Sequence, residues 1–192
     1  MQGNWDELTE AEKFRIILES KVERCGIGSL LEWLDEAGFY EAPASTKYHG
    51  AYPGGLVEHS NNVFRELTWL NAEEARKGRK EYSAEHIAVA ALLHDVCKAQ
   101  QYRLERVQTG QQYVFCGDAL PVGHGEKSVI MIQPFMELDP VEIIAIRWHM
   151  GAYDAAARSD LRELDRAFKQ CKLAAMLHLA DMMATHLDER EN

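Results

Sequence analysis

The sequence contains no long apolar run. No stretch approaches the roughly 18 consecutive apolar residues that a membrane-spanning helix needs. The opening residues, MQGNWDELTEAEKF, are acidic, whereas a signal peptide starts with basic residues and continues into an apolar segment. We therefore expect a cytoplasmic protein that has no membrane partner.

Positive charge is also scarce. The 192 residues include 21 Lys and Arg against 31 Asp and Glu, which gives a formal net charge of −10. Extended binding to nucleic acid depends on neutralising phosphates, so this balance disfavours it. A small anionic substrate is still compatible with the composition, because a bound metal ion would dominate the local field.

Cysteine is sparse and dispersed. The chain has four, at Cys25, Cys97, Cys116 and Cys171, and no two of them form a CxxC pair. Their spacing argues against a structural zinc knuckle and against a disulfide framework. We expect reduced thiols, most of them buried.

What the sequence does contain is a series of helical patterns, without internal repeats or a long linker. Its length suits a single domain with a substantial core. Apolar residues at helical spacing predict helices near residues 6–24, 28–37, 55–77, 84–97, 124–136, 140–150 and 170–188.

One segment departs from this helical pattern. The stretches YRLERV and QQYVF flank Thr109 and Gly110 and predict a short β-hairpin near residues 101–116, lying over one side of the bundle. The predicted fold class is therefore all-α with a small hairpin excursion. We divide the single domain, 1–192, into N-terminal helices in 1–40 and a core in 41–190.

Several histidines and aspartates occupy positions that should be apolar. The stretch AALLHDVCK, for example, places a His-Asp pair at the end of an apolar run. One further histidine stands between two glycines, where the backbone can approach a site closely. The residues of this set are His59, His94, Asp95, His124, His149 and Asp181.

Each member of this set has an ordinary explanation when it is taken singly, as a hydrogen-bonded core histidine or a salt-bridged aspartate. Burying several such groups separately costs free energy, because every one needs its own partner. One metal centre would satisfy them together. Four imidazoles and two carboxylates suit iron, manganese, zinc or nickel, and they suffice for two ions with Asp95 as a bridge.

The order of these six residues along the chain resembles that of the HD-domain superfamily of metal-dependent phosphohydrolases, which is named for the adjacent His-Asp pair. The likeness covers roughly residues 40–190. The stretches HGAYPGGLVEHS, LLHDVCK, GHGEKS and RWHMG are similar to HD proteins of bacteria and their prophages, and GGLVEHS resembles the HD domain of bacterial 3′–5′ exoribonucleases. The resemblance implies a helical bundle with the metal site in its centre, so that residues 41–190 would be the metal-binding core.

The resemblance also implies ligand roles for a centre of two divalent transition-metal ions. The first-ion ligands correspond to His59, His94, Asp95 and Asp181. The additional ligands of the two-metal branch correspond to His124 and His149, with the aspartate of the pair bridging both ions. Some two-metal relatives have consecutive histidines at the fourth position, whereas Met150 follows His149 here. We therefore expect a second ion that is held more weakly, or whose coordination is completed by water or substrate.

Basic residues near the motifs are candidates for binding phosphate. Lys98 makes the His-Asp stretch an HDxxK variant, which resembles relatives in which this lysine faces the substrate, and we assign it a catalytic role beside Asp95. A solvated residue beyond a helix end is the ordinary alternative. The further candidates for anion binding, each equally compatible with a surface role, are Lys47, His49, Lys127 and Arg147.

The resulting hypothesis is a phosphohydrolase. It would hydrolyse a phosphomonoester or phosphodiester, such as a nucleotide or a small compound derived from nucleic acid, through a hydroxide that bridges the metals. Two alternatives stay open. The same ligands occur in di-iron HD oxygenases, and the bundle could also serve as a non-catalytic nucleotide-binding protein.

Overall fold

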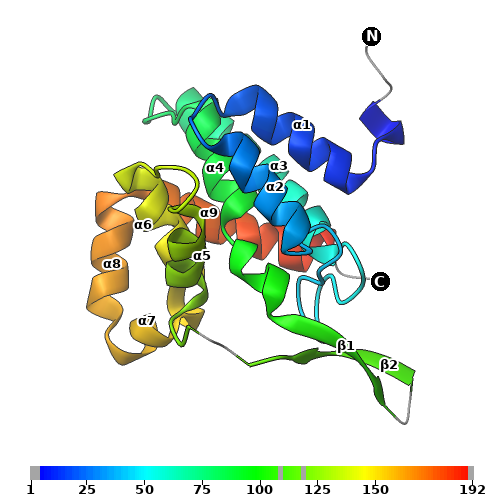
Figure 1. The fold of residues 1–192 in the computed structure, drawn as a ribbon. Helices are drawn as coiled ribbons and strands as arrows, with labels where there is room; N and C mark the ends of the chain where they lie inside the picture. The colour runs from blue at the N-terminus through cyan, green and yellow to red at the C-terminus, as the bar shows by residue number, and fades with distance from the viewer. Residues whose placement is uncertain (1–4, 108–109, 118–119, 190–192) are drawn as a thin grey trace.

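The computed structural model describes residues 5–107, 110–117 and 120–189. Within them, α-helices surround one central helix and a two-stranded hairpin extends from the bundle (Figure 1). The helices are α1 (Glu10–Lys21), α2 (Ile27–Glu36), α3 (Gly55–Arg76), α4 (Ala84–Leu93), α5 (His124–Ile132), α6 (Pro140–Trp148), α7 (Ala155–Ser159), α8 (Leu161–Gln170) and α9 (Lys172–Met183). The all-α class with one hairpin is confirmed.

The central helix is α4, whose sequence AEHIAVAALL is apolar almost all round. Every residue from Ile87 to Leu93 is buried, because α1, α3 and α6 all pack against this helix. Ser83 caps its start by accepting a hydrogen bond from the backbone N–H of His86.

The predicted end of this helix at residue 97 is wrong. The α-helix stops at Leu93, because Asp95 leaves the helical conformation at φ −117° and ψ 20°. A 3-10 helix, Val96–Gln100, follows and turns the chain toward the hairpin. Because of this break, the side chains of the His-Asp pair point toward the centre of the bundle.

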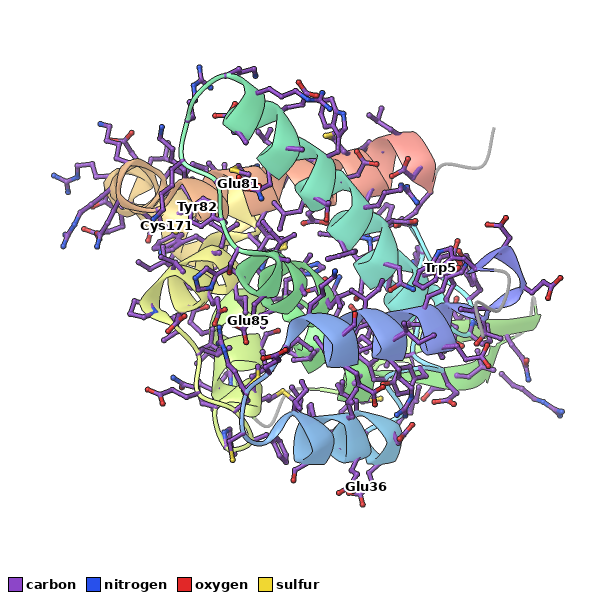
Figure 2. All side chains as sticks on the ribbon, turned by 90° about the horizontal axis from the view of Figure 1, so that it is seen from above. Trp5, Glu36, Glu81, Tyr82, Glu85 and Cys171 are labelled. Carbon is purple, nitrogen blue, oxygen red and sulfur yellow. The ribbon has the colours of Figure 1, made fainter. Side chains whose placement is uncertain are left out.

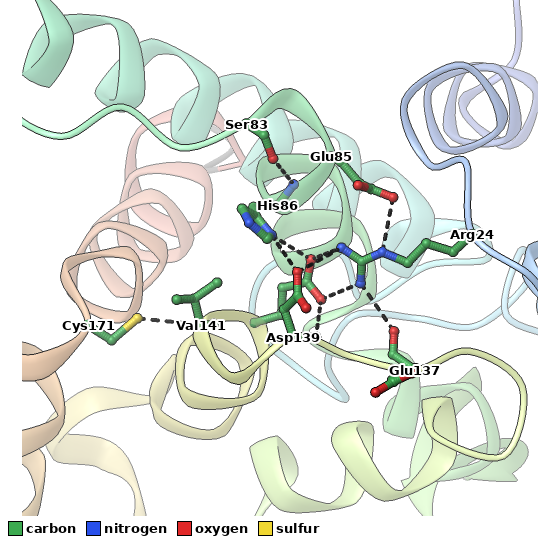
Figure 3. A network of polar contacts seen from close by, with 9 residues as sticks. Arg24, Ser83, Glu85, His86, Glu137, Asp139, Val141 and Cys171 are labelled. Atoms are coloured by element: carbon green, nitrogen blue, oxygen red, sulfur yellow. Dashed lines mark hydrogen bonds and ion pairs between the residues drawn. The ribbon is translucent and has the colours of Figure 1, made fainter.

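The N-terminal helices are joined to the rest by an arginine between them. Arg24 donates to both carboxylate oxygens of Glu142 on α6 over 2.7 Å and to Glu85 on α4 over 3.0 Å (Figure 3). Glu142 is fully buried, and His86 also contacts its carboxylate at 2.9 Å. A bidentate arginine–carboxylate pair fixes geometry as well as charge, so this network anchors α1 and α2 to the core.

The hairpin comprises β1 (Tyr102–Val107) and β2 (Gly110–Phe115), paired antiparallel with Tyr102 opposite Phe115. We had predicted that the hairpin lies over one side of the bundle. It extends away from the bundle instead (Figure 1). Leu104 and Phe115 are accordingly about half exposed. Thr109, predicted in the turn, lies outside the described residues.

The C-terminal part of the bundle includes helices that we did not predict. α7 and α8 precede α9, and Asp160 caps α8 by accepting from the N–H of Arg162. The loop before α4 is fastened to this region, because Tyr82 accepts a hydrogen bond from the N–H of Leu173 over 3.2 Å, close to Cys171 (Figure 2).

After α9 the last turn widens into a π-helix, Ala184–Asp188, so the helix predicted over 170–188 is α-helical only in its first part. No helix in the described parts of the chain is both long and apolar enough to span a bilayer. All four cysteines are free thiols, but only Cys97 and Cys171 are buried, so the expectation that most are buried is half right.

Candidate metal centre

Two of the predicted ligands end their helices in the same way. His94 follows α4 and His149 follows α6, and each has φ −58° and ψ −33°. In each ring Nδ1–H donates over 2.8 Å to the carbonyl oxygen three residues earlier, that of Ala91 or of Ile146. This hydrogen bond fixes the tautomer and leaves the Nε2 lone pair available to a metal.

His59 is held by a carboxylate instead. The fully buried ring lies on α3, and its Nδ1 donates to Glu189 over 3.0 Å. Asn62, one turn further along α3, donates to the same glutamate over 3.0 Å. Carboxylates orient metal-binding histidines in this manner. Glu189 was not among the predicted site residues, because its contact with His59 spans 130 residues of chain and leaves no local signal.

The two aspartates lie among the inner ring nitrogens. Asp95 places one oxygen 3.5 Å from Nε2 of His94 and the other 3.4 Å from Nε2 of His149. Asp181, on α9, places an oxygen 3.3 Å from Nε2 of His59. Four segments that are distant in the sequence therefore contribute to one centre.

Charge keeps both aspartates ionised. Burial would raise the pKa of Asp95, but Lys98 and His94 outweigh burial and hold that pKa well below its usual range. Burial would likewise raise the pKa of Asp181, and its contact with His59 lowers it instead. Burial would lower the pKa of His59, but Asp181 and Glu189 raise it to about 9. The centre is thus a buried anionic site that attracts protons or metal cations.

The converging atoms do not satisfy one another. Nε2 of His59, His94 and His149 and Oδ1 of Asp95 are buried and have no hydrogen-bond partner among the described residues. Leaving such atoms unpaired costs about 1–3 kcal/mol each. A divalent transition-metal ion, which prefers imidazole and carboxylate donors, would pair with all of them, so the residues present fit a metal.

His124 approaches the centre from α5. Gly125 beside it packs against α6 so closely that a Cβ atom there would lie 2.5 Å from the carbonyl oxygen of Ile146. This contact brings the start of α5 next to His149. The donor atoms of His124, Asp95 and Cys97 all lie within 4.8 Å of one another.

The predicted phosphate-binding residues are dispersed. Lys98 is buried, and its ammonium nitrogen lies 2.6 Å from Asp95. Lys127 is buried on α5, where its charge acts on His124. Arg147 pairs with Glu126 and Asp154, two carboxylates near Gly123 at the start of α5.

The remaining two candidates lie on the loop before α3. Lys47 is exposed, whereas the ring of His49 lies 4.9 Å from that of His59. Burial, followed by the charge of His59, lowers the pKa of His49 to about 4. His49 is therefore a neutral hydrogen-bonding group at neutral pH, not the cation that we had expected.

A pocket of about 560 Å³ adjoins the centre at His49 and Glu189. Its walls are residues 48–52 of the loop and Thr185, His186 and Glu189 beyond α9. The loop lies close to α3 because Gly50 and Gly55 are in contact, and a Cβ atom on Gly55 would lie 2.1 Å from the carbonyl oxygen of Gly50. The size suits a small organic ligand.

Comparison with known proteins gives a family. Residues 56–188 match the family model described as HD domain. The chain is 31% identical over 107 residues to dihydroneopterin 2',3'-cyclic phosphate phosphodiesterase of Methanocaldococcus jannaschii, an alignment that covers 55% of this chain and 40% of that protein. No solved structure gives a significant match. Because the family model spans more than half of the sequence, this chain belongs to the HD-domain superfamily of metal-dependent phosphohydrolases.

Proposed function

We propose that the protein hydrolyses a small phosphate ester in a metal-dependent reaction, and that a phosphodiester of a nucleotide or a related compound is its substrate. The observation that carries this proposal is the set of buried, unpaired Nε2 atoms beside two ionised aspartates. The name of the archaeal relative describes a cyclic phosphodiesterase, which favours a diester over a monoester.

We assign the metal ligands as the sequence implies. His59, His94, Asp95 and Asp181 would hold a first ion, and Asp95, His124 and His149 would contribute to a second. Iron, manganese, nickel and zinc all accept this mixed set of nitrogen and oxygen donors. When bound, such ions lower the pKa of water and neutralise charge on phosphoryl oxygens.

The protein adds a fixed positive charge of its own. Burial would lower the pKa of Lys98, but Asp95 raises it above its ordinary value, so the ammonium stays charged. If Asp95 held a metal ion, this ammonium would be available to bind a phosphoryl oxygen. In a site shielded from water, such a charge stabilises a transition state more strongly than it would in solution.

The pocket beside His49 suits the organic part of the substrate. Tyr48 and Tyr52 offer aromatic surfaces at its rim, and His49 and Glu189 offer hydrogen-bonding groups inside. A neutral His49 binds a heterocycle or a sugar hydroxyl without adding charge, so the pocket and Lys98 would recognise different parts of one substrate.

The test is a metal-swapped activity screen. Protein stripped of metal and reloaded with iron, manganese, nickel or zinc would be incubated with nucleoside monophosphates, linear dinucleotides and cyclic nucleotides, and phosphorus NMR would identify the products. We expect cleavage of diesters that requires metal and is lost in His94→Asn. Arg162→Met, on the exposed face of α8, is the matched control and should retain full activity.

Two results would replace this proposal. Oxygen consumption by the iron-loaded protein, with no ester cleavage by any form, would identify an oxygenase. Nucleotide binding that needs no metal and is unchanged in His94→Asn would identify a binding protein.

A further inference from the structure

A thiol lies within the metal centre. Cys97 follows the His-Asp pair, and its side chain is buried against α5. Its sulfur lies 3.6 Å from Nδ1 of His124. The backbone N–H of Cys97 donates to the Ser128 hydroxyl over 3.3 Å, which holds this part of the chain against the helix that carries His124.

The second ion lacks a donor that some relatives have. Met150 stands where those relatives have another histidine, and His149 already faces Asp95 and lies beside His94. Asp95, His124 and His149 would give the second ion three protein ligands, one short of a tetrahedral set. The donor atom of Cys97 lies within 4.8 Å of those of Asp95 and His124.

The spacing of these atoms suits coordination. In a tetrahedral centre with metal–sulfur and metal–nitrogen bonds of ordinary length, the sulfur and nitrogen donors are about 3.6 Å apart. The sulfur of Cys97 and Nδ1 of His124 have that separation. Asp95 Oδ1, which is buried and has no hydrogen-bond partner in the described chain, supplies a further donor.

We propose that Cys97 is a thiolate ligand of the second metal ion and completes its site together with Asp95, His124 and His149. Coordination replaces the S–H bond with a sulfur–metal bond and releases the proton to solvent. A soft sulfur donor selects zinc, iron or cobalt over magnesium and manganese at this position. The inference rests on the proposed two-ion centre and is independent of which ester the protein cleaves.

Cobalt provides a direct probe. Cobalt(II) would be titrated into the metal-stripped protein, with absorbance followed in the near ultraviolet, where sulfur-to-cobalt charge transfer appears only when a thiolate is bound. We expect this band in the wild type. We expect Cys97→Ser to lose the band, and its second cobalt equivalent to bind more weakly by at least the roughly 10–100-fold that loss of a supporting residue causes.

The control is Cys171→Ser, because Cys171 is also buried but lies beside Val141, away from the histidines. This variant should keep the band. A cobalt-bound wild type without the band, or a Cys97→Ser protein that keeps it, would overturn the assignment and leave Cys97 as a hydrogen-bonding neighbour of His124.

One further measurement and one combination of outcomes keep the result unambiguous. If Cys97→Ser does not fold, cadmium NMR of the wild type decides, since a thiolate ligand shifts the cadmium signal far from that of a site with only nitrogen and oxygen donors. A charge-transfer band in a protein that cleaves no ester would support this inference while contradicting the proposed function.

Discussion

The ammonium of Lys98 lies 2.6 Å from the carboxylate of Asp95, and both residues are buried. The two charges neutralise each other, and a metal ion held by Asp95 would compete with the lysine for the same carboxylate. Under the proposed function, Lys98 would therefore balance the charge of Asp95 in the absence of metal and would bind the substrate in its presence.

Lys98→Met tests this double role. Breaking a buried ion pair costs about 3–5 kcal/mol, so we expect the metal-free variant to lose that much free energy of unfolding. Metal affinity should stay the same or rise, because the competing cation is gone. Ester cleavage should fall about 100- to 1000-fold, as for loss of one group that stabilises developing charge. Urea denaturation, calorimetric metal titration and steady-state kinetics measure these effects. A variant that retains wild-type turnover would contradict the role in substrate binding.

Asp95→Asn should abolish binding of both ions, because Asp95 contributes to both proposed sites. Elemental analysis of the purified variant measures this loss directly. Asp165→Asn, in an exposed pair with Lys169, is the control and should keep the full metal content. Retention of one ion by Asp95→Asn would show that Asp95 does not bridge.

Glu189→Gln should weaken the metal affinity about 10- to 100-fold, because the carboxylate that orients His59 and increases its basicity is lost. Competition with a chromophoric chelator measures the affinity. Glu58→Gln is a matched control, since Glu58 lies beside His59 in sequence but accepts its hydrogen bond from Tyr52. Equal affinity in both variants would assign Glu189 a merely structural part.

The metal-free protein should lose stability as pH rises from 6.5 toward 9. The contacts of His59 raise its pKa from 6.5 to about 9. A raised pKa stabilises the folded state below the unfolded pKa, and this contribution disappears as pH passes the folded one. The loss is at most about 3 kcal/mol. Urea denaturation of the wild type and of His59→Asn at several pH values isolates the contribution of His59. If the free energy of unfolding depends on pH in the same way in both proteins, the raised pKa of His59 is refuted.

Arg24→Met should destabilise the protein by about 3–5 kcal/mol, because it leaves the carboxylate of Glu142 buried without its arginine. Arg162→Met, which breaks an exposed pair with Asp160, should change the free energy of unfolding by no more than about 1 kcal/mol. Thermal and urea unfolding of the two variants provide the comparison. Equal stability would show that the network in Figure 3 does not anchor α1 and α2.

Local pattern explains which elements could be predicted. The helices from α1 to α6 and α9, and the hairpin, follow from apolar spacing, which depends on neighbouring residues alone. α8 was missed although Asp160, a common helix-capping residue, and the buried Leu164 and Ala167 signal it, because most of its other residues are charged. The end of α4 was placed too late, since an apolar run continues through the break at Asp95.

The sequence by itself determined the fold class, the family and the polar residues that interrupt otherwise apolar patterns, because helical periodicity and a run of motifs are local properties of the chain. Only the tertiary structure decided which atoms meet. Glu189 reaches His59, Lys98 neutralises Asp95, Cys97 faces His124 and Arg24 holds Glu142. Most of these contacts join segments far apart in sequence, and each depends on where a helix ends and how closely its neighbour packs, which no local pattern encodes.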